Sequence, residues 1–452
     1  MKKQRSLTEG PITSTLLWFT IPFLLSNLLQ TLYGTVDTLT VGNFGSTAGV
    51  SAVSIGAQIL SLTTFLAIGL SSGGTVLVGQ SIGAKDEEKS KKVVGNMIID
   101  FAVISVLLVV IMLFVYPVIL NLLNTPAEAM SQASQYMRIC TFGIPLIIGY
   151  NIVCALLRAM GDSNSPLLFV AVACVVNIIG DLLLTGYFHM GAAGVAIATV
   201  CAQGVSFIFS LVFIMKKGMS FPFSKKDIKF DGTITKRIFQ IGVPMGIQSV
   251  LINLSFMFIT SIINSMGLTA SAAMGIGDKI TGFAFMPQSA FSASLAVVVS
   301  QNVGANKPKR IIKSVKTGMV LCCSVEAVFL VFCQIWPNVL PGLFSHDEAV
   351  IEMAGLYMKA YSIDALLTSV TFCLSGLLNG SGKTTFNLAQ NLIATFGGRI
   401  PATWLLSKLP NTNLFFIGLA APASTIISVV LLGLYIIPGR WKRDLPLEYS
   451  NE

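Results

Sequence analysis

The sequence predicts an all-α, polytopic membrane protein whose twelve transmembrane helices form two six-helix lobes related by a parallel internal repeat. Three observations predict this fold class: the composition, the spacing of apolar segments and the repetition of short motifs. Of the 452 residues, 54% are hydrophobic and only 11% are charged, whereas soluble proteins carry about 25% charged residues. A lipid bilayer must therefore replace water over much of the surface of this chain.

Twelve apolar segments are long enough to cross a bilayer, which requires about 20 mainly apolar residues. Six lie in the first half, at residues 14–38, 48–78, 93–119, 136–157, 166–188 and 191–215. Six follow a lysine-rich break, at residues 238–263, 272–299, 314–336, 352–376, 386–407 and 413–437. We therefore expect an N-lobe (1–215), a cytoplasmic linker (216–237), a C-lobe (238–437) and a cytoplasmic tail (438–452).

The basic residues lie in alternate loops. If the N-terminus is cytoplasmic, the inner segments hold 24 of the 29 Lys and Arg residues and the outer loops hold only Lys408. This asymmetry predicts that both termini are cytoplasmic. The net charge of +9 is thus explained by membrane topology, and no nucleic-acid partner is expected.

The two halves repeat the same landmarks at an offset of about 221 residues. Pro22 coincides with Pro244, Gly45 with Gly267, and Gln80–Ala84 with Gln301–Ala305. Because each half has an even number of predicted helices, both halves have the same orientation in the membrane. Parallel repeats of this kind are typical of transporters that alternate access to a central cavity.

Several motifs together resemble one known family. They are Pro22, Asn27, Gln30, Tyr33 and Asp37 in the first segment, Gly79-Gln80-Ser81-Ile82-Gly83-Ala84 after the second, and Arg158-Ala159-Met160-Gly161-Asp162 after the fourth. This combination resembles the multidrug and toxic compound extrusion (MATE) family over the whole chain. The resemblance implies a V-shaped pair of lobes that export amphiphilic organic cations in antiport with H⁺ or Na⁺. No other cofactor and no partner chain are expected, so the chain should act as a monomer.

Acidic residues inside apolar segments are the first candidates for a functional site. Asp37 is the only charged residue of its segment, and a carboxylate inside the bilayer costs about 2.5–3.5 kcal/mol on insertion scales. Asn177 and Asp181 are four residues apart and share one helix face, and Thr199 enters from the opposite direction. These residues reach similar depths at about 1.5 Å per residue, so we expect an oxygen-rich site for a proton or a monovalent cation.

The resemblance supports this site, because one branch of the family holds its coupling ion with a first-helix acid and a fifth-helix N-x-x-x-D pattern. A fourth-helix asparagine is also expected there. Cys154 stands at that position, and Asn151, one turn away, is the candidate. Pro22 removes a backbone hydrogen bond, and the resemblance implies a hinge that bends upon ion binding. A static kink is the alternative.

The second lobe holds a secondary candidate, Asp364. Another branch of the family places its ion site at this acid together with a glutamate in the seventh helix, but the seventh segment here has no acid. Lys359 or Arg399 can neutralise Asp364 instead. Asp278 and Glu326 are further charges within apolar segments. For all these acids, hydrogen bonding that only fixes helix packing is the alternative interpretation.

Two other function classes stay open. A lipid-linked oligosaccharide flippase of the same superfamily needs several cavity Arg and Lys residues to neutralise pyrophosphate, and Arg399 is the only strong candidate. A membrane enzyme needs a catalytic constellation, but H-E-x-x-H is absent and only two histidines occur. Gly382-Lys383-Thr384 lacks the first glycine of a phosphate-binding loop, because Leu377 stands there. We therefore expect a transporter of the cell membrane, not an enzyme.

Overall fold

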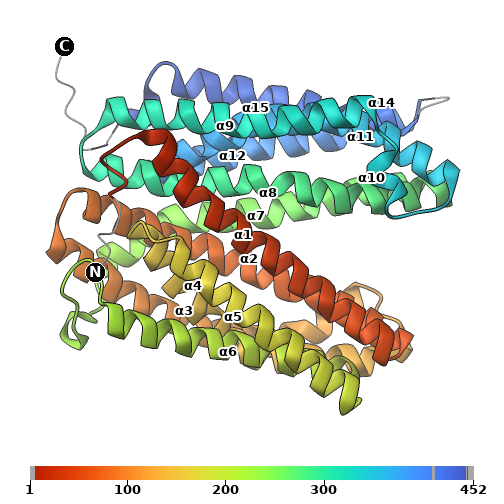
Figure 1. The fold of residues 1–452 in the computed structure, drawn as a ribbon, viewed down its shortest axis with the longest axis horizontal. Helices are drawn as coiled ribbons and strands as arrows, with labels where there is room; N and C mark the ends of the chain where they lie inside the picture. Colours follow the sequence, from red (N-terminus) through yellow and green to blue (C-terminus); the bar gives the residue numbers. More distant parts are fainter. Residues whose placement is uncertain (1–5, 410–412, 444, 446–452) are drawn as a thin grey trace. The chain divides into compact units, whose positions relative to one another are not determined.

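The computed structural model describes residues 6–409, 413–443 and 445, and every regular element among them is helical (Figure 1). The basic residues at positions 1–5 and the end of the predicted tail lie outside the described residues. The first half contains α1 (Ile12–Phe44), α2 (Thr47–Gly83), α3 (Glu87–Leu122), α4 (Ala127–Ala159), α5 (Asn164–Asp181), η1 (Leu182–Tyr187) and α6 (Gly191–Lys217).

The second half repeats this series with more interruptions. After η2 (Lys225–Asp227) it contains α7 (Gly232–Asn264), α8 (Leu268–Gly304), α9 (Pro308–Ile335), α10 (Val339–Gly342), α11 (Glu348–Gly380), α12 (Thr384–Ala394), η3 (Thr395–Arg399), α13 (Ile400–Ser407), α14 (Leu414–Gly418), α15 (Ala420–Ile436) and η4 (Arg440–Lys442).

The predicted transmembrane segments correspond to these helices. Within the described residues, eleven helices are long and apolar enough to cross a membrane. The predicted segment 386–407 corresponds to α12, η3 and α13, which follow one another without a loop from Thr384 to Ser407. A π-helical turn, η3, divides this helix into two α-helices, each of which is too short to cross a membrane by itself. The all-helical membrane fold is therefore confirmed.

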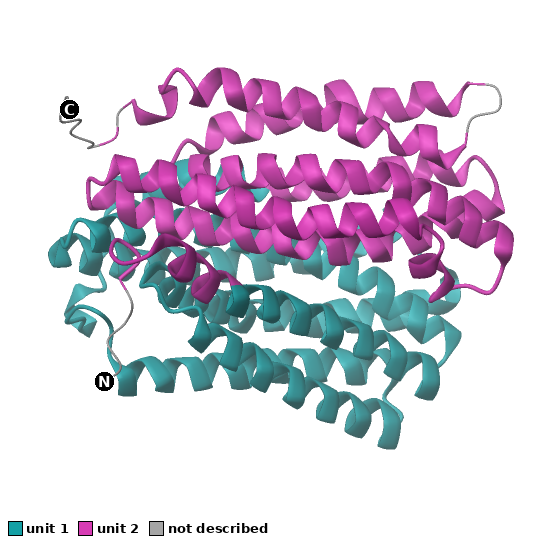
Figure 2. Ribbon diagram, turned by 45° about the horizontal axis from the view of Figure 1, so that its top comes forward, with its two compact units in different colours: residues 1–5, 21–246 teal, residues 6–20, 247–452 magenta. Residues whose placement is uncertain are grey.

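The chain forms two compact units, which Figure 2 shows in different colours. Unit 1 contains residues 21–246, and unit 2 contains residues 6–20 and the described residues from Ile247 onward. The most buried spans are α4 in unit 1 and α11 in unit 2, with 67% and 61% of their apolar windows buried. They begin 221 residues apart, at Ala127 and Glu348, so the same member of each repeat forms the centre of its unit.

Glycines allow α2 and the first part of α7 to cross in direct backbone contact within unit 1. A Cβ atom on Gly69 would lie less than 3.0 Å from the backbone of Gly246, and one on Gly73 would lie less than 3.0 Å from the Ile238 carbonyl. Gly242, in turn, lies against the backbone of Leu70. Two small-xxx-small patterns thus face each other, which is a common way for membrane helices to approach closely.

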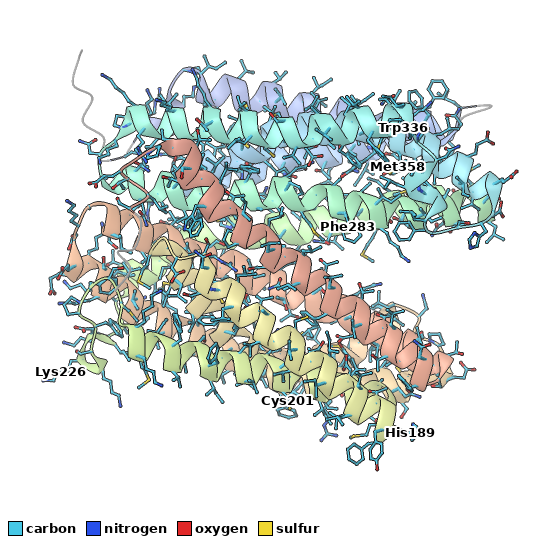
Figure 3. All side chains as sticks on the ribbon, in the orientation of Figure 1. His189, Cys201, Lys226, Phe283, Trp336 and Met358 are labelled. Carbon is cyan, nitrogen blue, oxygen red and sulfur yellow. The ribbon has the colours of Figure 1, made fainter. Side chains whose placement is uncertain are left out.

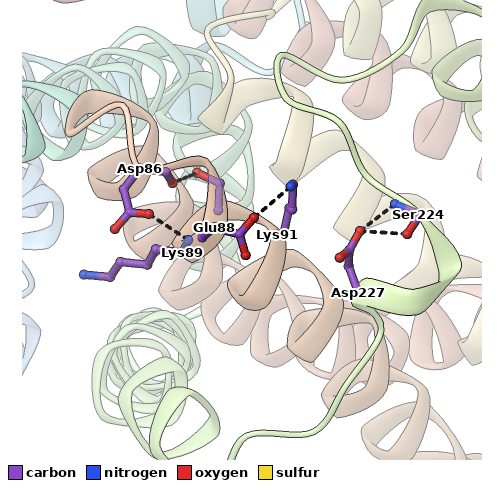
Figure 4. A network of polar contacts seen from close by, with 7 residues as sticks. Asp86, Glu88, Lys89, Lys91, Ser224 and Asp227 are labelled. Atoms are coloured by element: carbon purple, nitrogen blue, oxygen red, sulfur yellow. Dashed lines mark hydrogen bonds and ion pairs between the residues drawn. The ribbon is translucent and has the colours of Figure 1, made fainter.

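The basic loops of unit 1 lie at one end of its helices, where Figure 4 shows capping contacts around the start of α3. Asp86 Oδ1 accepts a hydrogen bond from the Lys89 N–H at 2.9 Å, and Lys91 Nζ lies 3.0 Å from Glu88. In the linker, Asp227 accepts from the Ser224 N–H at 2.7 Å. This backbone bond holds the pKa of the Asp227 carboxyl below its ordinary value. Lys226 and His189 mark opposite ends of the unit (Figure 3).

The linker is docked on α3 by buried polar groups. Asn96 Oδ1 accepts from the Asp231 N–H at 2.6 Å, and its Nδ2 donates to Asp100 at 2.8 Å. Thr235 Oγ1 also donates to Asp100, at 2.8 Å. Gly95 allows the backbone of Asp227 to approach closely, because a Cβ atom there would overlap it. The linker thus packs against α3 at both Asp227 and Asp231.

An ion pair joins the end of α6 to the loop between α4 and α5. Lys217 Nζ donates to Asp162, which also accepts from the Ser165 N–H at 3.0 Å and the Ser165 hydroxyl at 2.6 Å. Burial alone would raise the pKa of the Asp162 carboxyl, but the hydrogen bonds from Lys217 and Ser165 hold it below its ordinary value of 3.8. The ionised form is therefore the stabilised one.

We expect Asp162→Asn to lower the free energy of unfolding by about 1–2 kcal/mol at neutral pH, because it removes charged hydrogen bonds to a partly exposed lysine. The Asp162 carboxyl binds a proton more weakly in the folded state than in the unfolded state. Its contribution to the free energy of unfolding is therefore complete above about pH 4, and it is lost as the pH falls through the lower pKa of the folded state. Thermal unfolding of both proteins in detergent, at neutral pH and at pH values down to below about 4, measures this contribution. If the difference in stability between Asp162→Asn and wild type did not change with pH, this assignment would be contradicted.

Candidate functional site

Four predicted site residues come together inside unit 1. Asp37 lies on α1, Asn177 and Asp181 on α5, and Thr199 on α6, and their side chains are 7%, 1%, 0% and 5% exposed. Thr199 Oγ1 donates to Asp37 Oδ2 at 3.4 Å, and Asn177 Nδ2 donates to Thr199 Oγ1 at 3.5 Å. The Asp37 and Asp181 carboxyl groups lie within hydrogen-bonding reach of each other.

The site contains more acceptor oxygens than donors. Asp37 Oδ1, Asn177 Oδ1 and both carboxyl oxygens of Asp181 are buried without a hydrogen-bond partner. Such oxygens are costly inside a protein, and they require a proton, a cation or a donor. Among the described residues, no lysine or arginine interacts electrostatically with Asp37 or Asp181. The chemistry of the site therefore suits a proton or a small cation.

A second polar layer lies one helical turn from the first. Tyr33 precedes Asp37 by four residues on α1, and Gln203 follows Thr199 by four residues on α6. The Gln203 amide lies within hydrogen-bonding reach of the Tyr33 hydroxyl, and Gln203 Oε1 is buried without a partner. Neither residue was predicted as part of the site, although the i, i+4 spacing from Asp37 and Thr199 places them on the same helix faces.

The fourth helix contributes Cys140 at this depth. The Cys140 thiol lies close enough to Asp37 to interact with it electrostatically. Asn151, the predicted fourth-helix residue, lies eleven residues further along α4, or about 16 Å at 1.5 Å per residue. Its Nδ2 donates to the Ile147 carbonyl of its own helix at 2.8 Å. The structure therefore does not bring Asn151 to the other four predicted residues.

A change of helix type begins at the site. Asp181 is the last residue of α5, and the π-helix η1 starts at Leu182. The buried Thr185 hydroxyl in this turn donates to the Gly191 carbonyl at 3.2 Å, which ties η1 to the start of α6. Short π-helical turns often occur at functional sites because they shift the side chains that follow them. No pattern in the sequence indicated this turn.

Pro22 lies in the interior of α1, which continues through it to Phe44. The Ser26 hydroxyl donates to the Pro22 carbonyl at 2.8 Å. The Arg158 guanidinium stacks on the ring of Phe23, the residue after Pro22, with its carbon 4.5 Å from the ring centre. Proline lacks the N–H that would close a backbone bond, so α1 is locally weaker at this position.

The secondary candidate Asp364 lies in a different electrostatic setting in unit 2. Asp364 Oδ1 accepts from the Thr425 hydroxyl, and Arg399, at the end of the π-helix η3, acts on both Asp364 and Asp278. The Arg399 guanidinium also stacks on Phe256, with its carbon 4.6 Å from the ring centre. The positive charge of Arg399 thus stabilises the ionised forms of Asp364 and Asp278, whereas the acids of the unit 1 site lack such a charge among the described residues.

Comparison with known proteins decides the family. The MatE family profile matches residues 22–183 and again residues 244–405. The chain belongs to the MATE family. Both matches begin at the repeated prolines, Pro22 and Pro244, so the internal repeat predicted from the sequence is confirmed, as is the resemblance to this family.

Relatives of this MATE protein match along nearly its whole length. It is 27% identical over 421 residues to the probable multidrug resistance protein YoeA of Bacillus subtilis, covering 92% of this chain and 91% of the relative. It is 27% identical over 441 residues to the probable multidrug resistance protein YpnP of the same organism, covering 97% and 98%. Its fold is similar to an outward-facing multidrug resistance MATE family transporter, with a TM-score of 0.91, 18% identity and coverage of 98% and 99%.

Proposed function

We propose that this MATE protein is a secondary active multidrug efflux transporter, which exports amphiphilic organic cations by alternating access in antiport with H⁺ or Na⁺. We place it in the cell membrane with both termini in the cytoplasm, as the distribution of basic residues indicates. The names of the relatives YoeA and YpnP, probable multidrug resistance proteins, support multidrug efflux. The internal repeat supports the transport mechanism.

We infer that the coupling ion is H⁺ and that it binds between Asp37 and Asp181. The observation that carries this choice is the hydrogen-bonding reach between the two buried carboxyl groups. Two carboxylates without a proton cannot hydrogen-bond each other, and two like charges repel strongly in a medium of low dielectric constant. A proton on one of them turns the repulsion into a hydrogen bond.

The proposed cycle follows from this change of charge. With the proton bound, Asp37 and Asp181 hold α1 against α5, and Thr199 and Asn177 complete the contact. When the proton leaves, the pair repels, and α1 can yield at Pro22, where a backbone bond is missing. Pro22 thus acts as the hinge that couples proton release to the movement of α1.

Reconstitution in liposomes tests the coupling ion. We expect an imposed pH gradient to drive transport of a fluorescent organic cation without Na⁺, and a Na⁺ gradient at equal pH to drive none above liposomes without protein. Transport of the dye with the Na⁺ gradient alone would mean that the coupling ion at this site is Na⁺ and not H⁺. A failure of the dye to move under either gradient would contradict cation export and would favour a flippase.

A further inference from the structure

Unit 2 contains a buried carboxylic acid that the proposed mechanism does not use. Glu326 lies on α9, which packs against α8 and α11. Its side chain is 1% exposed, and both carboxyl oxygens are buried without a hydrogen-bond partner. It lies nine residues from the end of α9 at Ile335, or about 14 Å at 1.5 Å per residue. Glu326 is therefore inside the apolar layer and faces protein.

The Gln288 side chain lies next to Glu326. It belongs to α8, it is 0% exposed, and its amide group lies within hydrogen-bonding reach of the Glu326 carboxyl. Gln288 Nε2 donates to the Ala365 carbonyl of α11 at 3.1 Å, while Gln288 Oε1 is buried without a partner. Two neighbouring buried side chains thus hold three acceptor oxygens without a partner. A shared proton would satisfy two of them at once.

Within the part of the chain that the structure describes, no positive charge compensates Glu326. The titratable groups whose charges interact with it are Cys322, Cys323 and Cys333 on α9 and Tyr361 on α11. None of these groups carries a positive charge in either of its protonation states. An ionised carboxylate without a partner in such a place costs several kcal/mol. Asp364 differs from it, because Thr425 and Arg399 act on that residue.

The position of Gln288 connects this acid to the packing of three helices. Gln288 follows Pro287 in α8, and a proline in a helix interior removes one backbone hydrogen bond. Through Gln288, Glu326 on α9 is linked to α8 and to the backbone of α11 beside Asp364. An ionised Glu326 would attract the Gln288 N–H that now binds Ala365. Loss of the proton would therefore loosen the contact between α8 and α11.

We propose that Glu326 is a proton-binding site of unit 2, separate from the Asp37–Asp181 pair, whose carboxylic acid donates its proton to Gln288 Oε1. The site is assigned from three observations: Glu326 is fully buried, the amide oxygen of the neighbouring Gln288 lacks a partner, and no cation compensates the acid among the described residues. Its use in transport rests on the function proposed above, whereas the binding of the proton does not.

Infrared spectroscopy of the purified protein in lipid tests the binding directly. We expect wild type at neutral pH to show the C=O stretching band of a protonated carboxylic acid, and Glu326→Gln to lose the part of the band that belongs to this residue. Gln288→Leu should keep that part but shift its frequency, because the hydrogen bond to the amide oxygen is lost. The exposed Glu352 provides the matched control, since Glu352→Gln should leave the band unchanged.

Three outcomes would overturn the proposal. The first is a band of equal intensity in wild type and Glu326→Gln, which would mean that Glu326 is ionised. The second is a component assigned to Glu326 that does not shift in Gln288→Leu. The third is removal of that component by Na⁺ at constant pH, which would make this a sodium site.

Transport in liposomes then tests its use in the cycle. We expect Glu326→Gln to move the organic cation with one proton fewer per substrate than wild type, while Asp37→Asn loses proton-driven transport. The two failures are distinguishable. If Asp37→Asn transports normally, the proposed coupling site is wrong but the infrared result on Glu326 stands. If the infrared component is absent, the unit 2 site is wrong whatever the transport assay shows.

Discussion

Substituting either carboxyl group of the unit 1 site should nearly abolish efflux. We expect Asp37→Asn and Asp181→Asn each to reduce export of a fluorescent cation by about 10- to 100-fold, because a hydrogen bond to a charged group contributes about 1.5–3 kcal/mol and each 1.4 kcal/mol corresponds to a factor of ten. Both side chains are buried and within hydrogen-bonding reach of each other. An amide keeps the shape of each side chain but cannot bind or release the proton.

The assay compares cells that lack their own efflux pumps and contain equal amounts of each variant in the membrane. Asp86→Asn is the matched control, since Asp86 is an exposed N-cap of α3 and asparagine caps helices equally well. This control should export the dye like wild type. Full efflux by both site variants would show that the pair is only a packing contact and would make Asp364 the leading candidate.

A bulky side chain at the crossing of α2 and α7 should prevent folding. At Gly73 a Cβ atom would lie less than 3.0 Å from the Ile238 carbonyl oxygen and the Gly242 nitrogen, which are backbone atoms that cannot rotate away. We expect Gly73→Leu to destabilise the protein by at least about 3 kcal/mol, the upper range for overpacking. Its abundance in the membrane should fall to about a tenth of wild type or less, as measured by quantitative immunoblotting.

Gly275→Leu separates steric overlap from the general effect of replacing a glycine in a helix. Gly275 lies inside α8, and a Cβ atom there meets nothing within 4 Å. Leucine has the higher helix propensity in both places, so this variant should accumulate like wild type. Equal abundance of Gly73→Leu and wild type would mean that α2 and α7 do not approach as closely as the structure has them.

The transmembrane segments were predictable because a bilayer imposes a fixed length and an apolar composition on each helix. The repeat of landmarks was visible for the same reason, since both halves meet the same constraint and retain matching turns such as Gln80–Ala84 and Gln301–Ala305. The π-helical turns η1 and η3 were not predictable. They depend on how neighbouring helices pack, and they leave the apolar pattern of the segment unchanged.

The convergence of the site residues was partly predictable. Asp37 stood out because it is the only charge in an apolar segment, and the spacing of Asn177 and Asp181 fixed their common helix face. The depth of the fourth helix against α1 is a tertiary property. The sequence therefore suggested Asn151, whereas in the structure Cys140 is the residue of this helix within electrostatic range of Asp37. The layer of Tyr33 and Gln203 was missed, although its spacing from the predicted residues was available.

The charges of unit 2 show where a single sequence becomes ambiguous. From the sequence, either Lys359 or Arg399 could be the partner of Asp364. The structure shows that Arg399 interacts electrostatically with both Asp364 and Asp278. Glu326 was visible as a charge in an apolar segment, but its burial against Gln288 depends on the rotation of α9 relative to α8. Rotation about a helix axis is set by packing, which the hydropathy of one segment does not determine.

Proton release on substrate binding tests the central claim most directly, namely that Asp37 and Asp181 share a proton which is exchanged for the substrate. The purified protein, in weakly buffered detergent solution with a pH-sensitive dye, receives the organic cation at neutral pH without Na⁺. We expect wild type to release protons and the double variant Asp37→Asn/Asp181→Asn to release fewer, although it still binds the cation. Equal proton release by the two proteins would contradict the account.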